Sequence, residues 1–293
     1  MKAQFQKIII NEESSFIAKE LNLPRFDIEF HFHPEFELKY VSQSKGIRFI
    51  GDSVENFQEG DLVLLGPNIP HYWNNDALSC GSDNLSKAYL VMFSESFLGK
   101  EFFQLPEMSP IQDLLNQAKG GICFSNTGKF DIAGKLKRLI SYEGPLKIIL
   151  LLDILTELSK AEKRPLLTQT YIEELPSMNY SDHSVERLKR VYEYVLANFQ
   201  RKIQIHEVAA IANMSPYAFC KYFKKSTVKT FMTFLCELRI CHAKKLLIQK
   251  EELAISDICH DSGFDNVSNF NRTFKKLTTM TPKEYRKHYI KLQ

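Results

Sequence analysis

Two segments about fifty residues apart repeat one pattern, and this repeat limits the possible folds more than any other feature of the sequence. The first copy is IHEVAAIANMSPYAFCKYFKKST (205–227) and the second is ISDICHDSGFDNVSNFNRTFKKLT (255–278). Both copies begin with Ile, contain two Phe residues four positions apart, and end in Lys-Lys-x-Thr. Such a repeat predicts one helical supersecondary unit that is used twice.

Each copy has the outline of a helix-turn-helix, in which a sharp turn joins two helices. The expected turn residue is Asn213 in the first copy and Gly263 in the second, the two residue types that best tolerate a left-handed backbone. Ser215 and Asp265 then follow as candidate caps of the second helix. The alternative is a plain helical hairpin with a solvated polar face. Two copies with the same turn chemistry favour the helix-turn-helix.

The second helix of each copy is predicted to have one apolar and one polar face. Phe219 and Phe223 are four residues apart, as are Phe270 and Phe274, so each pair lies on one side of its helix. These Phe residues are expected to form the core. The polar and basic residues between them therefore point outward.

The charge of the chain is unevenly distributed. Residues 1–180 contain 18 basic and 24 acidic residues, a net charge of −6, whereas residues 181–293 contain 20 and 11, a net charge of +9. A basic C-terminal part is typical of a domain that binds a polyanion, although many solvated surfaces are basic too. The sequence contains no run of about 18 apolar residues and no CxxC pair among its six cysteines, which indicates a cytoplasmic protein without a membrane span.

Residues 185–290 resemble the AraC/XylS family of transcription regulators. The residues that carry this resemblance are Ile255, Ile258, Gly263, Phe264, Ser268, Phe270, Arg272, Phe274, Lys275, Lys276, Thr281, Pro282, Tyr285 and Arg286. The segment 230–247 resembles the helix that connects the two units in that family. The family commonly has Gly where this chain has Val228 and Thr279, which affects the expected turns rather than the fold.

The resemblance implies that the second helix of each unit enters the major groove of DNA. By matching position, the residues that face DNA are Tyr217, Cys220 and Lys221 in the first unit, and Val267, Ser268, Asn269, Asn271 and Arg272 in the second. Arg and Asn can contact guanine and adenine edges with two hydrogen bonds. The residues expected at phosphates, which give affinity rather than sequence choice, are Lys224, Lys225, Lys275 and Lys276.

The N-terminal part is predicted to be a cupin-like β-barrel. Residues 30–41 alternate as a strand does, and the short apolar segment 60–65 is a second strand candidate. Short strands separated by turn signals indicate a barrel or sandwich. Alternation along a strand would place His31, His33 and Glu37 on one face. Together with His71 they resemble the two motifs of cupins, although the spacing is imperfect. The motifs EFELKYV, GDLVLLGP and PHYW are closer to the cupin-like sensor domains of the AraC/XylS family.

Three interpretations of these histidines remain open. They could hold the metal of a cupin enzyme, hold a metal in a sensor, or be structural or contact an organic effector. The last is expected, with no metal and no catalytic residue, and with His31, His33, Glu37, His71 and Trp73 as candidate effector contacts. An aromatic ring such as Trp73 could stack on a sugar, so a sugar is one possible effector.

Two helices are expected after the barrel, at 132–142 and 145–160. In the resembled family such a segment often pairs subunits, and the apolar stripe of the second helix is wide enough for that, so a homodimer is expected. Intramolecular packing alone is the alternative. The predicted organisation is a sensor and dimerisation domain (1–163), a linker (164–183) and a DNA-binding domain (184–293).

The sequence therefore predicts an α+β protein of two domains: a cupin-like barrel with a helical dimerisation segment, and an all-α domain with two helix-turn-helix units. Its expected function is sequence-specific transcription regulation under the control of a small-molecule effector, with double-stranded DNA and RNA polymerase as partners. The alternative is a metal-dependent cupin enzyme with a C-terminal helical interaction module. The effector, the operator and the choice between activation and repression stay open.

Overall fold

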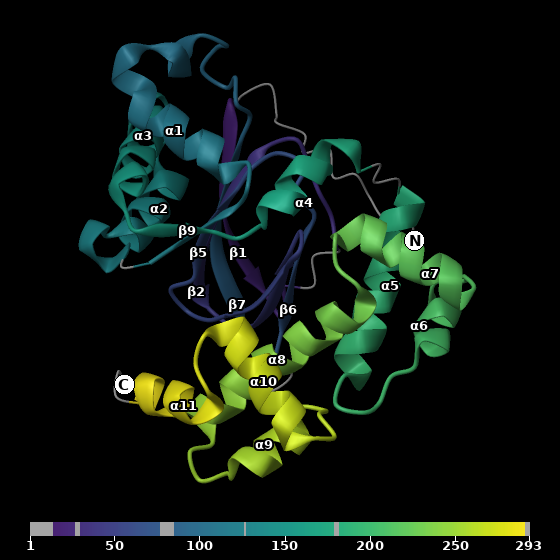
Figure 1. Cartoon of the computed structure of the whole chain (residues 1–293). Coiled ribbons are helices and arrows are strands. Elements are labelled where there is room, and N and C mark those ends of the chain that lie inside the picture. Colours follow the sequence, from purple (N-terminus) through teal and green to yellow (C-terminus); the bar gives the residue numbers. More distant parts are fainter. Residues whose placement is uncertain (1–13, 27–29, 77–84, 126, 179–181, 291–293) are drawn as a thin grey trace. The chain divides into compact units, whose positions relative to one another are not determined.

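The chain forms two compact units that divide between Ser177 and Met178, except that Val54–Asn56 group with the second unit. The computed structural model describes residues 14–26, 30–76, 85–125, 127–178 and 182–290 (Figure 1). The described strands all lie before Met178, and after it the described elements are helices. This confirms the prediction of a sheet-rich N-terminal region followed by a helical C-terminal domain.

The strands of the first unit form two sheets. The larger has the strand order β1-β7-β2-β5-β8-β9 and the smaller has the order β4-β3-β6. The bounds are β1 Phe16–Leu23, β2 Phe36–Gln43, β3 Gly46–Ile50, β4 Ser53–Phe57, β5 Leu62–Leu65, β6 His71–Asn75, β7 Ser86–Phe93, β8 Ile122–Phe124 and β9 Lys163–Pro165. Among the described residues the paired strands do not close into one barrel, so the cupin-like barrel itself is not demonstrated.

Strand β2 is buried on both faces. Phe36 and Leu38 belong to the apolar core of the first unit, while alternation turns Glu37 and Lys39 to the opposite face, where both are also buried. The strand begins only at Phe36, so the prediction of a strand over 30–41 was wrong for its first six residues. Pro34 lies two residues before Phe36, and a proline cannot donate a ladder hydrogen bond.

Helices cover one face of the large sheet (Figure 1). They are α1 Ser109–Ala118, α2 Ile132–Ser141 and α3 Pro145–Lys160. The two predicted helices are confirmed as α2 and α3, with Asp131 accepting a hydrogen bond from Gly134 N at the start of α2. Helix α3 buries Leu151, Ile154, Leu155 and Leu158, but leaves Leu146 and Ile149 exposed.

The segment 164–183, predicted as a linker, is largely folded structure. Its first residues complete β9, which pairs with β8, and α4 follows at Gln169–Glu174. Leu166, Leu167 and Tyr171 are buried, and Asp52 accepts hydrogen bonds from the backbone and hydroxyl of Thr168, the cap of α4. The boundary between the two units does fall within the predicted linker, but the first part of that segment is folded, because it carries buried apolar side chains in a polar, proline-containing stretch.

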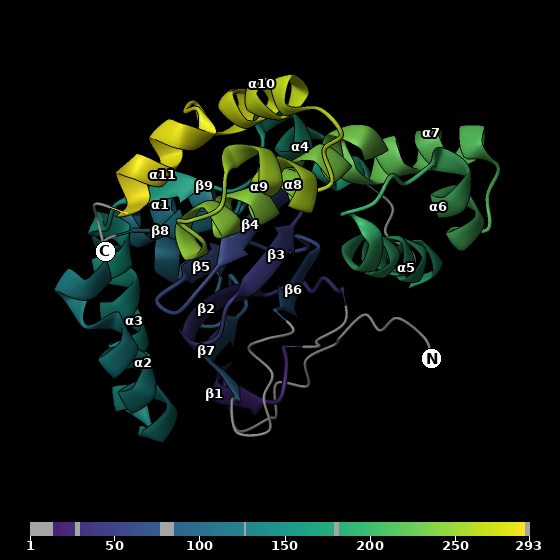
Figure 2. The same cartoon turned by 90° about the horizontal axis from the view of Figure 1, so that it is seen from below.

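The second unit is built from helices α5 to α11 (Figures 1 and 2). Their bounds are α5 Asp182–Asn198, α6 Ile205–Ile211, α7 Pro216–Thr227, α8 Phe231–Gln249, α9 Ile255–Asp261, α10 Val267–Thr278 and α11 Pro282–Ile290. The pairs α6–α7 and α9–α10 are the two predicted helix-turn-helix units, and α8 connects them. None of the described helices combines the length and the apolar content that crossing a lipid bilayer requires.

The predicted Phe pairs form the core of each helix-turn-helix. Phe219 and Phe223 are fully buried, with ring centroids 5.6 and 5.5 Å from that of Phe231 at the start of α8. Phe270 and Phe274 are equally buried in the second copy. The apolar stripe of each second helix therefore packs inward as its periodicity predicts.

The two turns have the predicted left-handed backbone. Asn213 has a φ of 54° and Gly263 a φ of 82°. Ser215 caps α7 by accepting a hydrogen bond from Ala218 N, as predicted. In the second copy the cap is Asn266, which accepts from Ser268 N and Asn269 N, and not Asp265. The one-residue insertion in the second copy moves the cap by one position.

The two departures from the resembled family also adopt left-handed conformations. Val228 has a φ of 58° and Thr279 a φ of 66°, and each ends a second helix. A β-branched residue in this region is strained, at a cost on the order of 1–3 kcal/mol. The turns therefore keep the geometry that Gly would give, in spite of the side chains that occupy them.

Candidate nucleic-acid interface

The outer faces of α7 and α10 carry the residues that the sequence predicts to face DNA. Tyr217 is 82% exposed although it is a large aromatic residue, and Cys220 and Lys221 on the same helix are exposed. The predicted residues of α10 that are exposed are Ser268, Asn269, Asn271 and Arg272. Val267 is different, because it is half-buried and packs against the core of the second copy. Its side chain therefore contributes to the packing of the second copy and is not fully available to DNA.

The start of α10 presents small polar side chains and a single long donor. Arg272 Nη2 donates a hydrogen bond of 3.1 Å to Asn269 Oδ1, one turn earlier on the same face. Asp265 and Asp261 lie nearby in the sequence and could have paired with Arg272, but the hydrogen bond that forms is to Asn269. The guanidinium keeps further N–H donors for another acceptor, because Arg has five.

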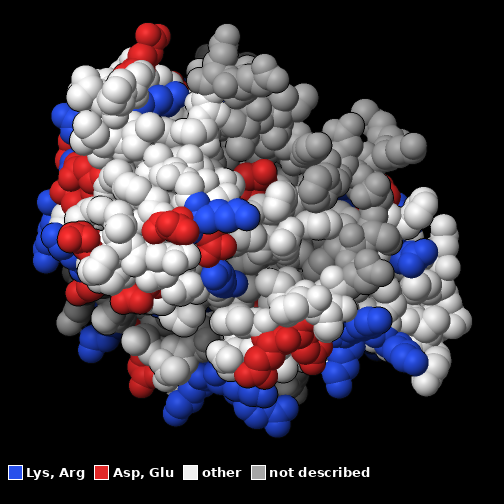
Figure 3. Space-filling model, turned by 90° about the horizontal axis from the view of Figure 1, so that it is seen from above, with Lys and Arg blue, Asp and Glu red and all other residues white. Residues whose placement is uncertain are grey.

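The four predicted phosphate contacts lie in the last turns of the two helices. These exposed residues are Lys224 and Lys225 on α7, and Lys275 and Lys276 on α10. A cation in the last turn also interacts favourably with the negative end of the helix dipole. Figure 3 shows the different charge pattern of the first unit, where acidic and basic side chains are intermixed over the helices of that face.

A second cluster of functional side chains lies buried in the first unit. His31, His33, Glu37 and His71 each offer a ligand atom, and these atoms lie within 4.8 Å of one another. His31 and His33 precede β2, while Glu37 lies on β2 and His71 begins β6. The structure therefore brings together the four residues that the sequence singled out, although His31 and His33 lie before the observed strand β2 and not on it.

Glu37 is at the centre of this histidine cluster. His33 Nε2 lies 3.1 Å from Glu37 Oε2, and His71 Nε2 lies 3.5 Å from the same oxygen. Burial by itself would raise the pKa of Glu37, but the neighbouring His71 and His33 lower it well below its usual value. Glu37 is therefore a carboxylate, held ionised by the imidazoles around it.

Sequence reasoning missed a buried lysine beside this cluster. Lys39 is 2% exposed, and its Nζ lies 3.6 Å from the ring centre of Trp73 and 4.8 Å from that of Phe26. Burial lowers the pKa of Lys39 to about 8, against the opposing attraction of Glu37 and Asp61. Alternation could have revealed it, because residues two apart on a strand share a face and Glu37 had already been assigned inward.

A buried arginine adds a further charge to this interior. Arg48, on β3, is 2% exposed and its Nη1 lies 3.4 Å from Asp61 Oδ1. It stands opposite Trp73 in the pairing of β3 with β6. The face of the small sheet that carries Trp73 therefore also carries a paired guanidinium.

The histidine cluster has a donor set that suits a divalent metal. Imidazole nitrogens and a carboxylate oxygen bind Zn, Fe, Mn and Ni. His33 Nδ1 and His71 Nε2 are buried and make no hydrogen bond, although each lies 3.5 Å from a carboxylate oxygen, so these nitrogens could act as ligands. A bound metal would supply Lewis-acid chemistry. The hydrogen bond between His33 and Glu37 satisfies two of the same side chains without an ion.

We expect the purified protein to contain well under one transition metal ion per chain, because the spacing of the motifs departs from cupins and Glu37 is already hydrogen-bonded. Elemental analysis of the purified protein measures this directly. About one Zn, Fe, Mn or Ni per chain, lost in His33→Ala and in Glu37→Ala, would contradict the expectation. His206→Ala, on α6 in the second unit, is the matched control.

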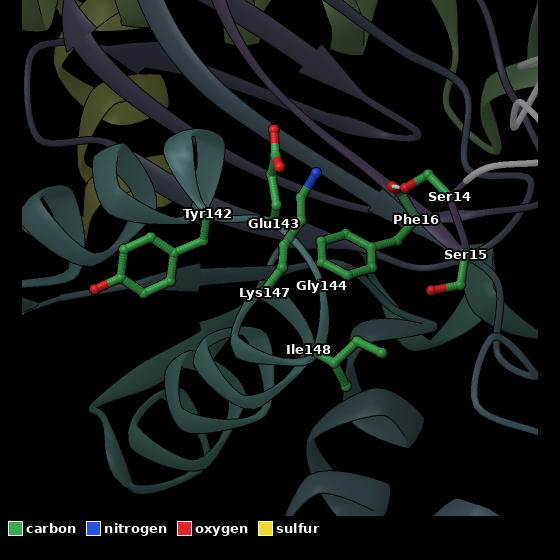
Figure 4. Close-up of a pocket in the computed structure, with 8 residues that line it drawn as sticks. All are labelled: Ser14, Ser15, Phe16, Tyr142, Glu143, Gly144, Lys147 and Ile148. Atoms are coloured by element: carbon green, nitrogen blue, oxygen red, sulfur yellow. Dashed lines mark hydrogen bonds between the residues drawn. The ribbon is translucent and has the colours of Figure 1, made fainter.

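A surface hollow at the beginning of α3 is a weaker candidate. It has a volume of about 530 Å³ and is lined by Ser14, Ser15, Phe16, Tyr142, Glu143, Gly144, Lys147 and Ile148 (Figure 4). Lys147 Nζ lies 5.4 Å from the ring centre of Phe16. The polar side chains of this lining are exposed or half-exposed, so they provide no desolvated group that would hold a ligand.

Comparisons with known proteins concern mainly the C-terminal part. Residues 208–288 match a family described as "Helix-turn-helix domain". An uncharacterized HTH-type transcriptional regulator of Staphylococcus aureus is 32% identical over 136 residues, which are 44% of this chain and 18% of that protein. The uncharacterized HTH-type transcriptional regulator YobQ of Bacillus subtilis is 29% identical over 136 residues, 45% of this chain and 52% of that protein. The chain thus spans about half or less of these relatives.

Solved structures with some similarity include a probable AraC family transcriptional regulator from Rhodopseudomonas palustris, with 26% identity and a TM-score of 0.34 over 35% of this chain and 96% of that one. Apo ToxT from Vibrio cholerae has 17% identity and a TM-score of 0.38 over 93% and 97% of the two chains. The family match and the two helix-turn-helix units agree in position. The C-terminal part of this chain, residues 208–288, is a helix-turn-helix domain.

Proposed function

We propose that the protein is a cytoplasmic transcription regulator, not an enzyme, which binds specific sequences of double-stranded DNA through α7 and α10. The observation that carries this proposal is the pair of similar helix-turn-helix units, each with an apolar stripe in the core and an exposed polar face on its second helix. The residues proposed to face bases and phosphates are those described above for the two helices.

The connecting helix supports the use of both units on one DNA molecule. Helix α8 has 19 residues, and at about 1.5 Å per residue a helix of that length spans roughly 28 Å. Successive major-groove segments on one face of DNA are about 34 Å apart. A helix of this length is therefore a suitable spacer for two reading helices.

We expect residues 178–293 alone to bind cognate DNA, more weakly than the full chain, with an affinity that falls steeply with salt. Each Lys or Arg that neutralises a phosphate releases a counterion, so a contact set of four lysines or more gives a steep dependence on log salt. Fluorescence anisotropy between 50 and 200 mM salt on selected operator fragments measures this. Binding that is independent of salt, or absent at every salt concentration, would rule out the proposed DNA interface.

The first unit is proposed to be a sensor with cupin-like architecture, whose effector contacts His31, His33, Glu37, His71 and Trp73. The burial of these five side chains in one interior supports this assignment. The alternative, a metal-dependent cupin enzyme with a helical interaction module, is favoured by the same histidine cluster. If the protein retains promoter fragments and turns over no substrate, the result would favour the sensor over the enzyme. RNA polymerase is a further proposed partner.

We propose that the protein is a homodimer that pairs through α3. Leu146 and Ile149 are 61% and 59% exposed on one side of this helix, which is unusual for large aliphatic residues in a folded unit. A second copy of the same helix would cover them. Intramolecular packing alone would leave them in water.

Replacing both Leu146 and Ile149 by Glu is expected to raise the dimer dissociation constant at least tenfold, because burying a Leu or Ile contributes about 1.5–3 kcal/mol. Analytical ultracentrifugation measures the constant. Leu105→Glu is the matched control, since Leu105 is also exposed and lies outside α3. A wild-type monomer at micromolar concentration, or a dimer unaffected by both substitutions, would exclude this interface.

A further inference from the structure

The ammonium group of Lys39 is buried beside aromatic rings and has no oxygen partner within the described part of the chain. Its side chain is 2% exposed, and its close neighbours are the ring faces of Trp73 and Phe26. Lys39 forms no hydrogen bond and no ion pair with any of the described residues. Glu37 and Asp61 attract the ammonium without forming a hydrogen bond to it. Burying an ammonium without a directly hydrogen-bonded anion is costly, so a folded protein normally supplies one.

Trp73 Nε1 in the same interior is a buried donor without a hydrogen-bond partner. His33 Nδ1 and His71 Nε2 also lack a hydrogen bond, but each lies 3.5 Å from a carboxylate oxygen, that of Glu35 and that of Glu37 respectively. The ring centroids of His71 and Trp73 are 5.6 Å apart and those of His33 and His71 are 5.2 Å apart, so these groups adjoin one another. Unsatisfied buried donors are rare in folded proteins and each one calls for an explanation.

The pattern of unsatisfied groups selects among possible ligands. A metal ion would use the histidines and Glu37, but it would leave the ammonium of Lys39 unmatched and would be repelled by it. A neutral sugar could accept a hydrogen bond from the ammonium but would bring no charge to it. A carboxylate would accept hydrogen bonds from Lys39 Nζ and Trp73 Nε1, and hydroxyl or keto oxygens on the same molecule could engage the imidazoles.

We propose that the interior of the first unit binds a small organic acid, such as a sugar acid or hydroxy acid, whose carboxylate is held by Lys39 and Trp73. This inference rests on the proposed role of the unit as a sensor and specifies the chemical class of its effector. Lys39 is then the residue that distinguishes an acid from the corresponding neutral sugar. Phe26 and Trp73 provide the apolar walls around the ammonium.

The first test needs no ligand. If Lys39 is reserved for a ligand, Lys39→Met should stabilise the protein in chloride buffer and raise its thermal midpoint by about 2–4 °C. Lys19→Met, at an exposed position of β1, is the matched control and should leave the midpoint unchanged. A lower midpoint for Lys39→Met would show that another group of the chain pairs with the ammonium, and would overturn the proposal.

The second test uses matched ligands on the full-length protein at constant ionic strength. Glucose and glucuronate differ only at one carbon, and acetate, lactate, pyruvate and citrate extend the series of acids. At least one acid should raise the thermal midpoint of the wild type and of Lys19→Met, but not of Lys39→Met, while glucose has no effect. Equal responses of wild type and Lys39→Met to every acid, including no response, or glucose acting as well as glucuronate, would refute the proposal.

The two tests separate this proposal from the proposed regulation of transcription. Neither test measures DNA binding. A protein that responds to acids and does not bind DNA would therefore support the proposed ligand site and refute the proposed regulation of transcription. A protein that binds operator fragments and shows no acid response dependent on Lys39 would support the proposed regulation of transcription and refute the proposed organic-acid site.

Discussion

Gly263→Asn is expected to destabilise the second unit by at least about 3 kcal/mol, whereas the reverse exchange in the first copy, Asn213→Gly, should change stability by less than about 1 kcal/mol. The two residues stand at matching turns, and both have a left-handed backbone, with φ values of 82° and 54°. Each substitution puts into one copy the residue that the other copy uses. The expected difference therefore comes from the surroundings of the turn.

The reason is the close approach of other chain segments to Gly263. A Cβ atom at this position would lie 2.5 Å from the carbonyl oxygen of Phe199 and 2.9 Å from Nε of Arg239. These two atoms are joined by a hydrogen bond of 2.8 Å, and Arg239 Nη2 donates a second one to the carbonyl of Arg201. Because the clash involves backbone, it cannot be relieved by turning a side chain. Asn213 already has a Cβ, so its surroundings accommodate one.

Urea unfolding of the full chain, followed by helical circular dichroism, measures both changes. Binding to operator DNA should be lost in Gly263→Asn and kept in Asn213→Gly, since α9 and α10 can no longer pack in the former. Gly60→Asn is a further control, because Gly60 also has a positive φ and nothing lies within 4 Å of a Cβ built there. If Gly60→Asn and Gly263→Asn cost the same, backbone conformation alone would explain both, and the close approach would not matter.

The helical C-terminal domain could be predicted almost completely, because its determinants are local. The periodicity of Phe219, Phe223, Phe270 and Phe274 fixed the inward faces, and Asn or Gly marked each turn. The cap of α10 was misplaced by one residue, since Asp265 and Asn266 are both good capping residues and only the backbone geometry decides between them. Matching by position to the resembled family also put Val267 outward, although it packs against the core.

The first unit was less predictable, because its structure depends on contacts between distant residues. The polar stretch after residue 163 forms β9 and α4 through burial of Leu166, Leu167 and Tyr171, which local composition does not reveal. The histidine cluster was predicted from spacing and is confirmed as a spatial group. Lys39 and Arg48 were missed, since charged residues are normally solvated, although alternation with Glu37 could have indicated the inward position of Lys39.

Arg272→Ala is expected to cost about 1–3 kcal/mol on cognate DNA and little on unrelated DNA, whereas Lys276→Ala should weaken both alike. Arg272 lies on the exposed face of α10, two residues from each of the buried Phe270 and Phe274. The residues on the helix-start side of it are small and polar, which allows a close approach to base edges. Arg is the commonest reader of guanine in the major groove.

The hydrogen bond to Asn269 strengthens this expectation. Asn269 Oδ1 accepts from Arg272 Nη2 and so holds the guanidinium in place before DNA arrives. A pre-positioned side chain loses less conformational entropy on binding. Asn269→Ala should therefore reproduce part of the loss of Arg272→Ala on cognate DNA, with no additional loss when both residues are replaced. Additive losses would mean that the two side chains contact DNA independently.

The measurement compares the DNA affinities of the wild type and of four variants on cognate and scrambled duplexes at matched salt. The variants are Arg272→Ala, Asn269→Ala, the combination of these two, and Lys276→Ala. Lys276 is exposed in the last turn of α10, where a phosphate contact would give the same loss on both duplexes and lower the slope of affinity against salt by about one counterion. If Arg272→Ala loses the same factor on both duplexes and lowers the salt slope as Lys276→Ala does, Arg272 contacts a phosphate. The choice of DNA sequence by α10 would then have to come from Ser268, Asn269 and Asn271.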